Sequence, residues 1–576
     1  MRRPRGLKPF RALLALLALA APVPGARAEP APGARGMVVA SQADAARAGR
    51  LQLERGGNAV DAAVATAFAL AVTQPFSAGL GGGAFVLVRE PGGEVVALDA
   101  RETAPAGADR DLYVRPGVAP DASLRGPLAV ATPGFVRGMA QALEGWGTKP
   151  LAEVLAPAIR LAEQGFAIGP YHARMLERMR EAGFPKRFPE TARIQFPQAG
   201  AAAEPGWILR QPELAATLRA LAADGPDAFY TGAIAKRIAA DQAARGGLVS
   251  AADLAGYRAV RREPVAGSYR GALVLSFPPP SSGGAVLIEA LNILEGFDLA
   301  ALGPDDPAAA HRVVEASKLA FADRAVWMGD PDFVEVPVAR LTSKPYAAEL
   351  RARILPAWWK RVLLRAEERA IRVEGAGLAA DDAGTTHLSA ADASGRAVAL
   401  TMSINTPFGS GLTVPGTGIL LNNEMDDFAQ APDQPNAYGL VDTRGANAIA
   451  PGKRPLSSMT PTILVRDGRV VLVTGSPGGP RIISTVLLTI LNTVDFGMDV
   501  QQAVAAPRYH HQWVPDRVAA EPLLSPEVVE GLRERGHEVE VETYPWSSAQ
   551  AIAVDPVTGL FLGGSDPRGD GAALGF

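Results

Sequence analysis

The first half of the chain has its apolar residues mostly at helical spacing. From Ser41 to Thr73 they recur among many alanines, and a glycine turn before Asn58 interrupts them. This pattern predicts two helices, with Asn58 and Asp61 placed to start the second one. Helical patterns also dominate from about Leu151 to Ala320, where the proline- and glycine-rich run 277–284 breaks them.

Alternating apolar residues predict three hairpins. One runs from Gly83 to Ala100 and turns at Pro91-Gly92-Gly93. The other two follow Thr385, where polar turns separate strands 386–391 and 397–405, and then strands 462–465 and 470–474. Helical patterns return at 481–491 and 525–535. Hairpins lying between helical segments favour sheets sandwiched between helical layers, which is an α+β fold.

The N-terminus has the three parts of a secretory signal. Basic residues within positions 2–8 precede an apolar run from Ala12 to Ala21, and Ala26-Arg27-Ala28 has the small-residue pattern of a cleavage site. The apolar run is too short to span a bilayer. We therefore expect residues 1–28 to be removed as a signal peptide, leaving a periplasmic or secreted protein without stable membrane insertion. A retained N-terminal anchor is the alternative.

Charge and cysteine content exclude several classes of function. The 576 residues include 57 basic and 60 acidic ones, mixed along the chain, for a net charge of -3. No polybasic field is present, so we expect no nucleic-acid partner. The chain has no cysteine, which excludes disulfides, thiol catalysis and cysteine-ligated metal. A nucleophile must therefore be an oxygen or a nitrogen atom.

A group of chemically suggestive residues begins two-thirds of the way along the chain, at Gly384-Thr385-Thr386-His387. A threonine hydroxyl is not acidic enough to act alone and needs a base. A threonine that becomes an N-terminus supplies that base itself, because its α-amine has a pKa near 8. Gly384 favours attack by Thr385 on the preceding carbonyl, since glycine adopts strained dihedrals with little steric resistance.

The order of motifs after Thr385 resembles the small subunit of gamma-glutamyltransferases, also called glutathione hydrolases. The run continues with Asn405-Thr406-Pro407-Phe408-Gly409, Leu421-Asn422-Asn423-Glu424-Met425-Asp426-Asp427-Phe428, Pro455-Leu456-Ser457-Ser458-Met459 and Gly475-Ser476-Pro477-Gly478-Gly479. The resemblance implies the four-layer αββα fold of N-terminal-nucleophile hydrolases. It also implies self-cleavage between Gly384 and Thr385 into a large subunit, residues 29–384, and a small catalytic subunit, residues 385–576, which stay together as a heterodimer. No metal or organic cofactor is implied.

The resemblance also gives roles to the catalytic residues. Thr385 is the nucleophile, and Ser403 stands where the family has a threonine whose hydroxyl bonds to the nucleophile. Gly478 and Gly479 supply backbone N–H groups to the oxyanion. The structural alternatives are a strand serine that faces solvent and a phosphate-binding loop, although no lysine follows the glycines as in a Walker motif.

A γ-glutamyl group carries an α-carboxylate and an α-ammonium, and a selective site must provide a partner for each charge. Arg101, Ser457 and Ser458 are expected to bind its α-carboxylate. Its α-ammonium is expected to bind Asn405, Glu424 and Asp427. Individually, Arg101 could instead form a surface salt bridge with Glu102, and the two serines could cap a helix or turn. The occurrence of the whole set in family order favours the functional roles.

Three further features are interpreted with alternatives. His387 lies on the same strand face as Thr385 and is interpreted as a packing or hydrogen-bonding residue rather than the base. Residues 432–444 resemble a lid loop in which Tyr438 reaches Asn405, the alternative being an ordinary surface loop. The segment 355–365, which includes Trp358-Trp359, could form an amphipathic surface helix or pack over Thr385.

The expected activity is attack on glutathione or another γ-glutamyl compound and transfer of the acyl group to water or to an acceptor amino acid or peptide. Two alternatives remain. One is a cephalosporin acylase on the same scaffold, acting on glutaryl side chains. Glu424 and Asp427 argue against it, because they would repel a second carboxylate. The other is an uncleaved homologue without catalytic activity.

Overall fold

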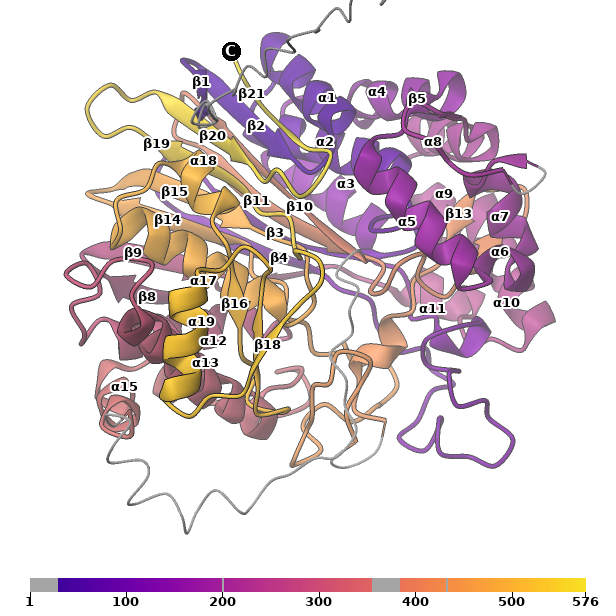
Figure 1. The fold of residues 1–576 in the computed structure, drawn as a ribbon. Helices are drawn as coiled ribbons and strands as arrows, with labels where there is room; N and C mark the ends of the chain where they lie inside the picture. Colours follow the sequence, from indigo (N-terminus) through magenta and orange to yellow (C-terminus); the bar gives the residue numbers. More distant parts are fainter. Residues whose placement is uncertain (1–28, 199–200, 355–383, 431–433) are drawn as a thin grey trace, which may run out of the picture.

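Two sheets lie face to face, with helices on both outer sides (Figure 1). The computed structural model describes residues 29–198, 201–354, 384–430 and 434–576. The predicted signal peptide and the segment containing Trp358-Trp359 lie outside these residues. None of the helices within them is long and apolar enough to cross a membrane. The α+β fold and its four-layer αββα arrangement are confirmed.

The first sheet carries Thr385. Its order, among the described residues, is β21-β2-β10-β11-β3-β4-β7. The strands are β2 (Gly36–Ala40), β3 (Gly83–Arg89), β4 (Val95–Ala100), β7 (Val260–Arg262), β10 (Thr385–Asp392), β11 (Ala397–Ser403) and β21 (Ala572–Gly575). The predicted hairpins at 83–100 and 386–405 are therefore confirmed, and they lie side by side through the pairing of β11 with β3.

The second sheet has the order β1-β20-β19-β15-β14-β9-β8 within the described residues. Its strands are β1 (Ala31–Gly33), β8 (Val265–Tyr269), β9 (Ala272–Ser276), β14 (Thr462–Arg466), β15 (Arg469–Gly475), β19 (Gln550–Val554) and β20 (Phe561–Ser565). The third predicted hairpin is confirmed as β14 and β15. Strand β15 leads directly to the diglycine of the candidate site.

Helices cover the outer face of each sheet (Figure 1). Those on the first sheet include α1 (Ala43–Glu54), α2 (Ala59–Thr73), α3 (Phe135–Trp146) and α4 (Leu151–Gln164); those on the second include α12 (Gly283–Leu294), α13 (Pro307–Trp327), α17 (Arg481–Val494) and α18 (Val500–Ala505). The predicted start of α2 is confirmed, because Asn58 and Asp61 form a capping box there.

Smaller elements connect these layers in the part of the chain that the structure describes. They are β5 (Phe166–Ala167), α5 (Pro170–Glu181), α6 (Phe184–Arg187), α7 (Pro189–Gln195), β6 (Ile208–Leu209), α8 (Pro212–Asp224), α9 (Asp227–Tyr230), α10 (Ala233–Arg245), α11 (Ala251–Gly256), α14 (Val338–Leu341), α15 (Lys344–Arg351), β12 (Thr413–Val414), β13 (Ile419–Leu420), β16 (Tyr509–His510), β17 (Val518–Ala520), α19 (Pro526–Glu534) and β18 (Val539–Val541), with short 3-10 turns at Pro127–Ala129 and Glu424–Asp427.

The prediction of a mainly helical stretch from 151 to 320 is wrong for residues 260–276, which form β7, β8 and β9. Strand β8 lies at the edge of its sheet, and only Val265 and Tyr269 of its side chains are buried. Its sequence therefore carries a weak apolar alternation. The strand predicted to end at Asn405 stops at Ser403, since Asn405 adopts a left-handed φ of 74°.

Alternation along β11 shows how the layers are held together. Val398, Leu400 and Met402 pack into the core beneath the helices, whereas Ala397 and Ala399 face the second sheet. Successive side chains of a strand point to opposite faces, so one strand contributes to both cores. Thr385 and Ser403 lie at the end of this doubly buried hairpin and are held by rigid elements.

Candidate active site

Thr385 is the first residue of β10 and lies directly opposite Ser403, the last residue of β11. Their hydroxyl oxygens are 3.0 Å apart, and both residues are buried. The Ser403 hydroxyl also donates to the carbonyl oxygen of Gly384 at 3.0 Å, and it accepts from the backbone N–H of Asn405 at 2.8 Å. One hydroxyl thus contacts both the predicted nucleophile and the carbonyl of the predicted cleavage site.

Gly384 is required by a close backbone contact. A Cβ at this position would lie 1.8 Å from the carbonyl oxygen of Asn405, which no side chain can tolerate. The structure thus adds a steric reason for glycine to the sequence argument from strained dihedrals, because glycine lets residues 384 and 405 pass each other.

His387 is a structural residue in this arrangement. It is fully buried, its Nδ1 lies 2.8 Å from the Thr401 hydroxyl, and its Nε2 lies 3.2 Å from the Ser389 hydroxyl. Burial lowers the pKa of His387 to about 3, so the imidazole is neutral at physiological pH. Gly475 makes room for the ring, since a Cβ there would lie 2.3 Å from it.

Arg101 follows β4 and is almost completely buried, so the alternative of a surface salt bridge is wrong. Its guanidinium forms an ion pair with Asp427, lies 3.0 Å from a Glu424 oxygen, and donates from Nε to the carbonyl oxygen of Pro455 at 3.2 Å. Glu102 lies farther away, at 3.8 Å. The residues expected to bind opposite charges of the substrate are therefore paired with each other.

Three acidic residues, Glu102, Glu424 and Asp427, surround the single guanidinium of Arg101. Burial raises the pKa of Glu102 to about 8, and burial also raises the pKa of Glu424 and of Asp427, although Arg101 opposes each shift. Burial alone would lower the pKa of Arg101, but the three carboxylates outweigh burial and raise it. Arg101 therefore remains charged, whereas burial favours the neutral, protonated form of the acidic groups that exceed its single charge.

Ser457 and Ser458 lie in an extended segment beside residues 281 and 282, not in a helix cap as in the alternative interpretation. The Ser457 carbonyl accepts from the backbone N–H and the hydroxyl of Ser282, both at 2.8 Å. The Ser457 hydroxyl accepts from the backbone N–H of Met459 at 3.0 Å. These bonds fix the segment, and both serines line the same cavity as Arg101.

Gly478 and Gly479 lie between β15 and α17, with φ values of 135° and 53°. Both values disfavour a side chain. A Cβ on Gly478 would meet the Ser547 hydroxyl at 2.3 Å, and one on Gly479 would meet the Tyr438 ring at 2.6 Å. Within the described part of the chain, neither backbone N–H donates to another residue. These donors are therefore available to an oxyanion.

Tyr438 lines the cavity and makes the contact with Asn405 on which the lid interpretation depends. Its hydroxyl donates to the carbonyl oxygen of Asn405 at 2.7 Å, and the residue is buried. The Asn436 side chain accepts from the backbone N–H of Tyr438 at 3.0 Å, and Gln512 donates to the Tyr438 carbonyl at 2.9 Å. The beginning of the predicted lid, Pro432 and Asp433, lies outside the described residues.

A single cavity brings most of the predicted residues together, and it is nearly full. Its free space of about 20 Å³ is close to that of one water molecule. A γ-glutamyl group therefore requires side chains to move. The predicted residues that line it are Arg101, Thr385, Ser403, Asn405, Asp427, Tyr438, Ser457, Ser458 and Gly479. Glu424 lies behind them against Arg101, and Gly478 is adjacent to Gly479.

Sequence reasoning missed the apolar wall of the cavity, which consists of Leu440, Leu456, Met459 and Ile482. It also missed Arg324, a buried residue whose Nε donates to the Ser282 hydroxyl at 3.0 Å. Burial lowers the pKa of Arg324 to about 10, while Asp427 and Asp442 oppose the shift. Apolar residues and a lone arginine on helix α13 carry no distinctive sequence signal.

Comparisons with known proteins agree with this geometry. The gamma-glutamyltranspeptidase family model matches residues 45–576. The chain is 44% identical over 537 residues to the glutathione hydrolase proenzyme of Escherichia coli (strain K12), which covers 93% of this chain and 90% of the relative. It is 41% identical over 556 residues to the acylase ACY 1 proenzyme of Pseudomonas sp. (strain SE83), which covers 95% of this chain and 94% of the relative.

Among solved structures, a cephalosporin acylase from Bacillus halodurans matches with a TM-score of 0.82 and 31% identity. The match covers 98% of this chain and 99% of that chain. The family model and the relatives each extend over nearly the whole length, and the range that the family model matches contains Thr385, the acidic residues and the diglycine. The chain therefore belongs to the gamma-glutamyltranspeptidase family.

Proposed function

We propose that this protein is a gamma-glutamyltransferase and glutathione hydrolase that is made as one chain and cuts itself between Gly384 and Thr385. The observation that carries the proposal is the contact of the Ser403 hydroxyl with both the Thr385 hydroxyl and the Gly384 carbonyl oxygen. The Thr385 oxygen attacks the Gly384 carbonyl carbon, and the peptide C–N bond breaks. The resulting ester is hydrolysed by water, which leaves a carboxylate on Gly384 and a free amine on Thr385.

The same threonine then performs catalysis. Its freed amine takes the hydroxyl proton, and the oxygen attacks the γ-carbonyl carbon of the substrate. The backbone N–H groups of Gly478 and Gly479 stabilise the oxyanion that forms, because neither is used by another described residue. The C–N bond of the substrate breaks and the leaving amine takes the proton. Water or the amine of an acceptor amino acid or peptide then attacks the acyl ester and frees Thr385.

Recognition of the donor follows from the charges in the cavity. The α-carboxylate of the γ-glutamyl group binds the Arg101 guanidinium with help from the Ser457 and Ser458 hydroxyls. To do so it displaces a carboxylate that now occupies the guanidinium. The α-ammonium of the substrate then binds the displaced acids, Glu424 and Asp427, together with Asn405. One substrate thus provides a partner both for the guanidinium and for the acids that pair with it in the structure.

The two cleavage products are proposed to remain together as a heterodimer in the periplasm or outside the cell. Strand β10, which follows the cut, pairs with β2 of the large subunit on one side, and β11 pairs with β3 on the other. These pairings support lasting association, because separation would expose both cores. The basic start, apolar run and Ala26-Arg27-Ala28 pattern support export.

Acylase activity is the second candidate, since a relative at 41% identity is called an acylase proenzyme. A pair of matched substrates separates the two. A γ-glutamyl anilide and a glutaryl anilide differ only in the α-ammonium group. We expect the γ-glutamyl compound to be cleaved with the higher kcat/KM, and Asp427→Asn to lower that value more than the one for the glutaryl compound. Faster cleavage of the glutaryl anilide would assign the protein to the acylases.

A further inference from the structure

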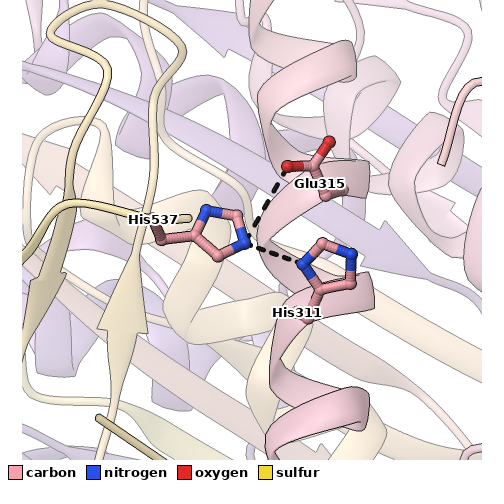
Figure 2. Close-up of side chains that lie close together, drawn as sticks. All are labelled: His311, Glu315 and His537. Carbon is pink, nitrogen blue, oxygen red and sulfur yellow. Dashed lines mark hydrogen bonds and ion pairs between the residues drawn. The ribbon is translucent and has the colours of Figure 1, made fainter. Parts of the chain in front are cut away.

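We propose that His311, Glu315 and His537, none of which lines the cavity around Thr385, form a binding site for a divalent transition metal of the Zn²⁺ type. Figure 2 shows the three side chains converging between helix α13 and the segment that follows α19. Each offers one donor atom, and the three donors lie within 4.8 Å of one another. Two imidazoles and one carboxylate form a donor set that Zn²⁺ binds in proteins.

The helix sets the position of two of the donors. His311 and Glu315 are four residues apart on α13, so their side chains lie one turn apart on the same face. Both are buried, with 7% and 8% of their surface exposed. The six histidines of the chain include only these two, 311 and 537, whose ring nitrogens approach each other within the described residues.

The third donor is held by the end of α19. The chain turns at Gly536, which has a left-handed φ of 89°, and the backbone N–H of His537 donates to the Leu532 carbonyl at 3.1 Å. Helix α19 in turn packs on α13, because Gly531 leaves space for Pro307. These contacts point the His537 ring at α13 without help from a ligand.

Two of the three donor distances need small adjustments to accommodate a metal, and the third pair of donors, on His311 and Glu315, lies within 4.8 Å. His311 Nδ1 lies 2.8 Å from His537 Nε2, and Glu315 Oε1 lies 3.9 Å from the same nitrogen. Ligands of a tetrahedral Zn²⁺ with bonds of about 2.0 to 2.1 Å are about 3.3 Å apart. The imidazoles must separate by about 0.5 Å and the carboxylate must approach by a similar amount. Three protein ligands leave the fourth position to water.

The site spans the two halves of the protein. His311 and Glu315 precede Gly384, and His537 follows Thr385. If the chain is cut as proposed above, a bound metal would join the large and small subunits. This bridging role rests on the proposed cleavage, whereas the metal site itself does not, because its three residues already meet in the uncut chain.

The test uses protein without a polyhistidine tag, dialysed against a chelator and titrated with Zn²⁺, with Co²⁺ as a spectroscopic probe and Mg²⁺ as a control. We expect one Zn²⁺ per chain, visible Co²⁺ absorption of a low-coordinate site, and no comparable response to Mg²⁺. His311→Ala, Glu315→Gln and His537→Ala should each weaken Zn²⁺ binding about tenfold or more. Lys318→Ala, on the next turn of α13, is the matched control and should bind normally.

Folding of each variant is checked by circular dichroism and by thermal unfolding without metal, and Glu315→Gln preserves the shape of the side chain. Zn²⁺ affinities of all three variants equal to that of Lys318→Ala would overturn the site. The site should bind Zn²⁺ equally well in uncut Thr385→Ala, which separates this test from that of the proposed function. In the cut protein, Zn²⁺ should raise the urea concentration at which the fragments separate; an unchanged concentration would overturn the bridging role.

Discussion

Thr385 Oγ1 lies 3.0 Å from Ser403 Oγ across the first residue pair of the β10–β11 hairpin. The same Ser403 hydroxyl lies 3.0 Å from the carbonyl oxygen of Gly384. A hydroxyl has one proton, so Ser403 can donate to the Gly384 carbonyl while it accepts from Thr385. This arrangement orients the nucleophile beside the bond it is proposed to cut, and after the cut it leaves the same serine next to the reacting oxygen.

Replacing Ser403 tests whether that hydroxyl serves both reactions. Ser403→Ala should slow both self-cleavage and turnover about 10- to 100-fold, as expected for loss of a hydrogen bond to a group that becomes charged. Cleavage is followed on denaturing gels over time, and kcat is measured with a γ-glutamyl anilide. Ser403→Thr keeps the hydroxyl and should retain most of both rates. An alanine variant as fast as the unchanged protein would remove Ser403 from the mechanism.

Arg101 tests substrate recognition. A lysine ammonium cannot reproduce the planar fork of a guanidinium, so Arg101→Lys should lower kcat/KM for glutathione by about 1 to 3 kcal/mol of transition-state stabilisation. Cleavage between Gly384 and Thr385 should continue, because Arg101 contacts neither residue in the structure. Thermal unfolding controls for the loss of buried ion pairs with Glu424 and Asp427. An unchanged Michaelis constant would contradict the assignment.

Gly479 tests the oxyanion role of the diglycine. Gly479→Ala should lower kcat about 100-fold or more, because a Cβ would strike the Tyr438 ring and move the N–H donor. Gly497→Ala is a matched control, since Gly497 also has a positive φ, 63° against 53° for Gly479, but has open space around it. The control places an alanine at a similar positive φ without the collision. Equal loss of kcat in both variants would show that strain alone is responsible.

The pH profile identifies the base. Burial lowers the pKa of His387 to about 3, so this imidazole is expected to be neutral near neutral pH. An ascending limb of kcat/KM near neutral pH must then come from another group, and the Thr385 amine, with a pKa of about 8 when free, is the candidate. His387→Gln should keep this limb, measured on a substrate whose own amine titrates elsewhere. Loss of the ascending limb in His387→Gln would show that His387 is the base.

Local chemistry made much of the fold predictable. The hairpin that pairs Thr385 with Ser403 follows from alternation around a short polar turn, and Asn58 with Asp61 marks the start of α2 by a capping box. Strand β8 was not predictable, because it lies at a sheet edge and buries few apolar residues. Strand β8 is recognisable only from its pairing with β9 in the structure.

The candidate site was predictable as a set of residues but not as a set of contacts. Arg101 is separated by more than 300 positions from Glu424 and Asp427, and nothing in the local sequence indicates that the three pair with one another. The reach of Tyr438 to Asn405 came from the family resemblance, and the bond from Gln512 that fixes Tyr438 depends on tertiary packing. Contacts of this kind are set by how the sheets are stacked.

The most direct test of the account is the mass of the purified protein under denaturing conditions, compared between the unchanged sequence and Thr385→Ala. The unchanged protein should give two fragments, one ending at Gly384 and one whose N-terminal residue, read by Edman degradation, is Thr385. Thr385→Ala should remain a single chain, because the attacking oxygen is missing while Ser403 and Gly384 are retained. Normal cleavage of Thr385→Ala, or a small fragment that begins at another residue, would contradict the assignment of Thr385 as the nucleophile.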